Sequence, residues 1–121
     1  MEIIMFNPNE LIALGINLDE ALERFMGKQS IYDKMLKKLP KAIEQYQVLE
    51  CFLEGDYEKA VANAHTLKGA TGNLSVTPLF TAYTEIVDNL RANNPQAAQA
   101  ILEEILPVQE KIVAYIEENA D

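Results

Sequence analysis

Apolar residues recur at intervals of three and four along most of the chain, which is the spacing of one face of an α-helix. No stretch combines alternating polarity with the β-branched residues that strands favour. Glycines, prolines and capping residues divide the pattern into segments. These segments predict helices over residues 8–14, 18–26, 57–74, 79–92 and 96–119. The sequence therefore predicts an all-α protein.

Residues at the predicted helix ends have the chemistry that helix ends require. Side-chain oxygens cap exposed N–H groups at the start of a helix, and glycine accepts the left-handed backbone that follows its end. The signals are Gly15, Asn17, Gly27, Gly55, Asp56, Thr77 followed by Pro78, and the turn Asn93, Asn94 and Pro95. Within the last helix, Pro107 predicts a kink.

The segment over residues 30–53 leaves two alternatives open. Its apolar pattern runs from Ile31 to Leu53, and Pro40 predicts a break or a kink. The segment is therefore one bent helix or two short ones. Because short connections favour antiparallel neighbours, we expect an up-and-down four-helix bundle with a short additional N-terminal helix. Residues 1–121 form a single domain in this prediction.

Composition narrows the possible partners and compartment. The chain has 121 residues, 49% of them hydrophobic, and a formal net charge of −9, which disfavours nucleic acid and anionic lipid. It has neither an apolar run long enough to span a membrane nor the N-terminal pattern of a signal peptide, so we expect a cytoplasmic protein. The single cysteine, Cys51, is predicted to be buried and inert.

Charge is distributed unevenly along the chain. Residues 95–121 carry six acids and one base, whereas residues 28–41 carry five lysines and one acid, Asp33. Residues 56–72 are neutral in sum. A lysine-rich run is usually a solvated helix face, and the alternative is a docking surface for an acidic partner.

The helix predicted over residues 57–74 contains His65, the only histidine of the chain. Its core-facing stripe is Tyr57, Ala60, Ala64, Leu67, Thr71 and Leu74, and His65 falls outside that stripe. The neighbours of His65 on the helix surface are small apart from one lysine; they are Val61, Ala62, Lys68, Gly69 and Gly72. Each glycine inside a helix costs roughly 0.5–1 kcal/mol relative to alanine, so two of them indicate a packing or approach requirement.

This surface suits the acceptance of a phosphoryl group. Imidazole is largely neutral at pH 7, so one ring nitrogen has a lone pair for attack on phosphorus. Lys68 lies one turn from His65, where its charge attracts an anion on the ring by about 1 kcal/mol at 4 Å in water. Phosphoryl transfer depends mainly on positioning and charge neutralisation. The alternative is that His65 is an ordinary surface residue with no task.

The stretch AHTLKGATGNL, residues 64–74, resembles the signature of the histidine-containing phosphotransfer (HPt) family. In that family the phospho-accepting histidine is followed by lysine at +3 and glycine at +4, here His65, Lys68 and Gly69. The resemblance covers roughly residues 15–117. It extends to GDYEKAVANAH before the site and to residues 18–40, where the matching positions are Leu22, Arg24, Phe25, Tyr32 and Leu36.

The resemblance implies a phosphocarrier in two-component signalling. A response-regulator receiver domain, phosphorylated on aspartate and holding Mg²⁺, would dock over His65, and a second receiver would take the group. The implied docking residues are Arg24, Val61, Ala62 and Gly72. The chain would be a monomer without intrinsic cofactor or metal and without a kinase or ATP site, in keeping with the lack of a P-loop motif. A hybrid sensor histidine kinase is a further implied partner.

One position departs from the family pattern. Ser75 stands where many members have glycine, and a serine there would crowd the approach of the receiver or end the helix differently. Two other classes of function remain as alternatives: a module that binds receivers without being phosphorylated, and a helical scaffold. An independent enzyme is least favoured, because one histidine and one cysteine on separate helices form no recognisable catalytic set.

Overall fold

The computed structural model describes residues 3–121, and every secondary-structure element in that range is a helix. The elements are α1 (Pro8–Ala13), α2 (Leu18–Arg24), α3 (Gln29–Leu36), α4 (Leu39–Gln45), α5 (Leu49–Glu54), α6 (Tyr57–Asn73), α7 (Thr77–Arg91) and α8 (Pro95–Asn119). The all-α prediction is confirmed. In this range no helix combines the length and the apolar character needed to cross a membrane.

Most helix ends lie within one or two residues of their predicted positions. Asn7, Asn17, Asp56 and Asn94 accept N–H groups of the first turns of α1, α2, α6 and α8. Helix α2 ends at Arg24 and not at residue 26. The reason is that Met26 and Gly27 both have left-handed backbone, with φ of 56° and 72°, which cannot continue a right-handed helix.

Residues 29–54 form three helices, so neither predicted alternative for residues 30–53 is correct. The first break precedes Pro40, which lies in the first turn of α4, where its missing N–H group costs nothing. The second break, between Gln45 and Leu49, has no proline or glycine to signal it. Apolar residues continue across both breaks, and for this reason periodicity could not reveal them.

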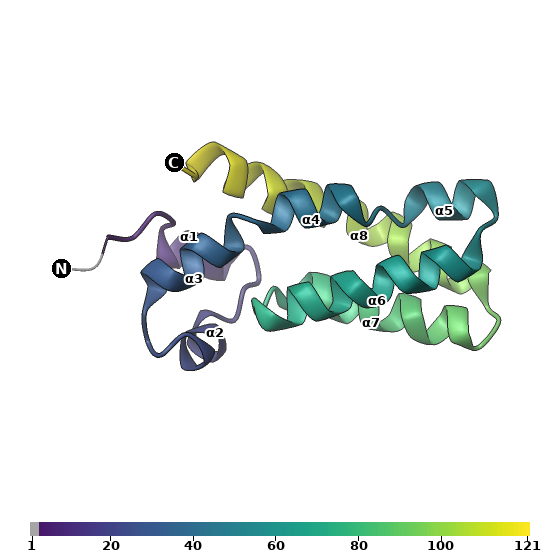
Figure 1. Cartoon of the computed structure of the whole chain (residues 1–121), viewed down its shortest axis with the longest axis horizontal. Helices are drawn as coiled ribbons and strands as arrows, with labels where there is room; N and C mark the ends of the chain where they lie inside the picture. Colours follow the sequence, from purple (N-terminus) through teal and green to yellow (C-terminus); the bar gives the residue numbers. More distant parts are fainter. Residues whose placement is uncertain (1–2) are drawn as a thin grey trace.

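Helices α6, α7 and α8 lie side by side, and successive members of this group run in opposite directions (Figure 1). Helices α4 and α5 follow one another along the same group and contact both α6 and α8. Helices α1, α2 and α3 gather at the end where α6 terminates. Helix α8 runs through Pro107 without a break, and the kink there stays a prediction.

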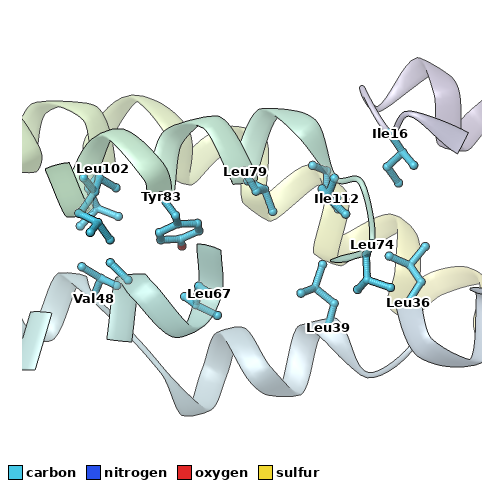
Figure 2. Close-up of a cluster of buried hydrophobic side chains, with 14 of the residues drawn as sticks. Ile16, Leu36, Leu39, Val48, Leu67, Leu74, Leu79, Tyr83, Leu102 and Ile112 are labelled. Carbon is cyan, nitrogen blue, oxygen red and sulfur yellow. The ribbon is translucent and has the colours of Figure 1, made fainter. Parts of the chain in front are cut away.

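The core lies between these helices, and Figure 2 shows ten labelled members of it. Leu36, Leu39 and Leu74 group at one end, and Val48 and Leu102 lie at the other. The predicted stripe of α6 is buried except at its first residue; the buried members are Ala60, Ala64, Leu67, Thr71 and Leu74. Tyr57, the first residue of the helix, is 45% exposed, and its ring contacts that of Phe52. Cys51 is buried as predicted, and desolvation raises the pKa of its thiol.

The end of α6 is a left-handed turn at Ser75, whose φ is 52°. The N–H groups of Val76 and Ser75 donate to the carbonyls of Thr71 (2.9 Å) and Gly72 (3.1 Å), which is the Schellman pattern of helix termination. The backbone N–H of Asn17 donates to the Ser75 carbonyl at 2.9 Å. The segment before α2 is therefore hydrogen-bonded directly to this turn.

Tyr32 of α3 binds the same turn from inside the protein. Its ring is fully buried and packs edge-on against Phe25, and its hydroxyl donates to the Leu74 carbonyl at 2.7 Å. Burial, together with the charge of Asp33, raises the pKa of Tyr32, so the hydroxyl keeps the proton that it donates.

We predict that Tyr32→Phe lowers the free energy of unfolding by about 1–3 kcal/mol, because it leaves the buried Leu74 carbonyl without a donor. The control is Tyr57→Phe, the same chemical change at an exposed position, which should shift stability by less than about 0.5 kcal/mol. Urea unfolding followed by circular dichroism measures both. Equal effects of the two substitutions would contradict this account of the α6 terminus.

Candidate functional site

His65 lies in the middle of α6 with its side chain exposed, beside a surface groove of about 400 Å³. The groove runs along α6 toward its C-terminal end and is closed by residues of α2 and α7. It brings together five of the residues singled out in the sequence, namely Arg24, His65, Lys68, Gly69 and Gly72. Val61 and Ala62 do not line it. Val61 is half-buried against the core, and Ala62 is exposed one turn before His65.

Lys68 is the cation beside His65. It lies three residues further along α6, about 4.5 Å along the helix axis, and is half-buried in the groove wall. Over residues 3–121 the only ion pair joins Arg24 to Glu20, so no acidic side chain neutralises the Lys68 ammonium. Its charge is therefore available to an anion on the imidazole.

The two glycines of the groove differ in what surrounds them. A methyl group added to Gly72 would lie 2.8 Å from Cδ1 of Phe80. The Phe80 ring of α7 therefore packs directly against the backbone of Gly72. A methyl group added to Gly69 would meet nothing within 4 Å. Gly72 is thus explained by internal packing. Gly69 gains nothing inside the protein that would offset its cost in a helix.

Arg24 is held at the far end of the groove by a cluster with Glu20 and Ser75. Its Nη1 donates to Ser75 Oγ at 2.6 Å, and its Nη2 donates to Glu20 Oε1 at 3.1 Å. Ser75 Oγ in turn donates to Glu20 Oε1 at 2.7 Å. These hydrogen bonds, that of Ser75 first, hold the pKa of Glu20 below its usual value, so the cluster contains a carboxylate and a guanidinium.

Arg24 is too far along the groove to neutralise charge at the imidazole in this arrangement. Its Nη1 also donates to the Asn73 carbonyl at 3.3 Å, and Asn73 lies eight residues after His65, about 12 Å along the helix axis. The two cations therefore have different positions: Lys68 lies beside His65, and Arg24 lies at the far end of the groove.

Ser75 neither projects from the surface nor ends α6 in an unusual way. Its side chain is 2% exposed and points into the cluster with Arg24 and Glu20. Its left-handed backbone is the conformation that favours glycine, at a cost of roughly 1 kcal/mol for other residues. The two hydrogen bonds of the hydroxyl offset that cost. Ser75 thus ends α6 in a left-handed turn with a buried side chain, and its effect on the approach of a receiver stays a prediction.

Sequence reasoning missed several groove residues, namely Glu20, Asn73, Thr77 and Phe80. Glu20 was recognisable, because a glutamate four residues before Arg24 forms a helical ion pair. Phe80 was not recognisable, since its contact with Gly72 depends on how α7 packs against α6. It is 38% exposed and adds an apolar wall next to Lys68 and Gly72.

Comparison with protein-family models, with curated proteins and with solved structures finds no match for this chain. Among the described residues, no group of three or more histidine, cysteine, aspartate or glutamate side chains is placed to hold a metal ion. The chemistry of the groove is that of an accessible imidazole, one cation beside it and an open approach over Gly69.

We predict that the two glycines respond oppositely to alanine. Gly69→Ala should raise the free energy of unfolding by roughly 0.5–1 kcal/mol, because it gains helix propensity in open space. Gly72→Ala should not raise the free energy of unfolding, because the added methyl group would displace the Phe80 ring. Urea unfolding provides the comparison. In a Phe80→Ala background the Gly72→Ala change should become stabilising, and its failure to do so would disprove the packing role of Gly72.

Proposed function

We propose that this protein is a histidine phosphotransfer protein. It accepts a phosphoryl group on His65 from the phospho-aspartyl group of a receiver domain and passes it to another receiver, as a phosphocarrier without a kinase site of its own. The observation that carries the proposal is the exposed His65 with an unneutralised Lys68 one turn away and unobstructed space over Gly69.

In the proposed transfer, a ring nitrogen of His65 uses its lone pair to form a bond to phosphorus. The bond between phosphorus and the aspartyl oxygen of the receiver breaks, and the carboxylate leaves with the electron pair. The other ring nitrogen of His65 keeps its proton. Lys68 stabilises the negative charge on the phosphoryl oxygens, and the Mg²⁺ needed for the step belongs to the receiver.

The proposal extends to the fold. We propose that α6, α7 and α8 form an antiparallel four-helix bundle of the HPt type, with α4 and α5 together as the divided fourth member. The packing of α4 and α5 against both α6 and α8 supports this arrangement. In this proposal the protein acts as a monomer in the cytoplasm, served by receiver domains and by a hybrid sensor kinase.

We predict that His65→Gln abolishes the transfer of labelled phosphate from a phosphorylated receiver domain, because the amide has no nucleophilic nitrogen. The control is Thr66→Ala, a change at the next, exposed residue, which should leave the transfer intact. The measurement is acid-labile label on the protein after mixing with the receiver. Label that persists on His65→Gln would disprove the assignment. Binding of the receiver without transfer to the wild-type protein would favour the receiver-binding alternative.

We predict that Lys68→Ala slows the transfer about tenfold, because the phosphoryl oxygens lose their nearest cation. Lys59→Ala removes the same charge from an exposed position on the first turn of α6 and serves as the matched control. Single-turnover kinetics with a phosphorylated receiver measure both variants, and urea unfolding checks that each is folded. Equal rates for Lys68→Ala, Lys59→Ala and the wild-type protein would show that Lys68 has no part in the transfer.

A further inference from the structure

A second cavity, of about 260 Å³, lies on the opposite flank of α6 from the His65 groove, between α6 and the chain from the end of α2 to α4. Its apolar lining consists of Phe25, Met35, Leu39, Ala42, Ala70 and Leu74. Among residues 3–121, Lys38 is the only charged residue that lines it. Asn73 lines both this cavity and the His65 groove, so the two hollows are separated only by the exposed ridge of α6.

The rim of this cavity is positively charged, in contrast to the protein as a whole. Lys38 lines the cavity, and Lys34 and Lys41 are exposed residues that adjoin the lining residues Met35 and Ala42 in the sequence. None of the three lysines forms an ion pair within residues 3–121. The nearby acid Asp33 forms no ion pair with them within residues 3–121; it is 1% exposed and accepts the backbone N–H groups of Met5 and Phe6. A chain with a net charge of −9 therefore presents a local cationic rim.

Apolar side chains around the cavity are exposed without an internal reason. Met35 is 41% exposed at the cavity wall, and Met26, the residue after the lining residue Phe25, is 77% exposed. Methionine adapts its shape to different apolar partners, which suits a binding surface. Apolar side chains ringed by charges of one sign are typical of a surface that binds a protein of the opposite sign.

The ridge between the two hollows is low. Gly69 lies on it, and a methyl group there would meet nothing within 4 Å apart from the adjoining backbone of α6 itself. Ala70 and Leu74 face the cavity on one side of the ridge, while His65 and Lys68 face the groove on the other. A partner that reaches His65 can therefore cross α6 at Gly69 and enter the cavity as well.

We propose that the partner that docks over His65 also occupies this second cavity, with an apolar side chain in the cavity and carboxylates against Lys34, Lys38 and Lys41. This inference rests on the proposed function and specifies the partner: among receiver domains, the protein selects those whose docking face carries acids around an apolar residue. The volume of the cavity suits one apolar side chain, and Lys38 at its wall suits a carboxylate beside that side chain.

The test is transfer from the purified, phosphorylated receiver domains of the host organism to two charge-reversed variants. Lys34→Glu/Lys38→Glu changes the rim of the cavity. Lys59→Glu/Lys111→Glu makes the same change in net charge at exposed positions on α6 and α8. Phosphoramidate, a small donor that needs no docking surface, measures the reactivity of His65 separately.

We expect the rim variant to lose at least about tenfold in transfer rate from the receivers that serve the wild-type protein, and the control variant to change less than about twofold. Wild-type transfer should weaken as salt is raised, and both variants should react with phosphoramidate at the wild-type rate. A rim variant that accepts phosphate from receivers at the wild-type rate would overturn this inference alone.

Two other outcomes would also overturn the inference. If the wild-type protein accepts phosphate from no receiver, the proposed function fails and this inference fails with it. If gel filtration finds a concentration-dependent oligomer that the rim variant abolishes, the occupant is the acidic α8 of a second copy of this chain and not a receiver.

Discussion

Three groups from the N-terminal part of the chain donate to the turn that ends α6: the Arg24 guanidinium, the Tyr32 hydroxyl and the Asn17 backbone N–H. This turn exists because Ser75 takes a left-handed backbone, which halts α6 and directs its last carbonyls toward those donors. The attachment places α2 beside one flank of α6, and α3 and the start of α4 beside the other. Both hollows next to His65 depend on it, since each has a wall from this N-terminal part.

The proposed function uses cations in both hollows, those in the groove and those at the second cavity. Glu20, the acidic residue that lines the groove, is bound to Arg24 and Ser75, and Lys68 forms no ion pair within residues 3–121. In the proposed function, the charge beside His65 is left for the phosphoryl group, and the exposed lysines further away would contact the docking face of the partner. Gly69 is the third feature of this surface. A glycine there lowers the stability of the helix, and no packing contact within residues 3–121 requires it.

Local signals predicted the helix class and most helix ends, because caps, left-handed glycines and prolines act over a few residues. The break between Gln45 and Leu49 carries no such signal, so the division of α4 from α5 could not be predicted. The same contrast between local signals and long-range contacts applies to the site. The placement of Lys68 and Gly69 beside His65 follows from helical spacing. By contrast, Phe80 packs against Gly72 through a contact between two different helices. The hydrogen bonds of Ser75 to Arg24 and Glu20 likewise join segments that are far apart in the sequence.

The central claim is that His65 is the residue that carries phosphate. The most direct test is phosphorus-31 NMR of the wild-type protein after incubation with a phosphorylated receiver domain, with the modified residue mapped by tandem mass spectrometry. We expect a single acid-labile phosphoryl group, bonded to nitrogen and mapped to His65. A phosphoryl group on oxygen, or release of inorganic phosphate with His65 unmodified, would contradict it.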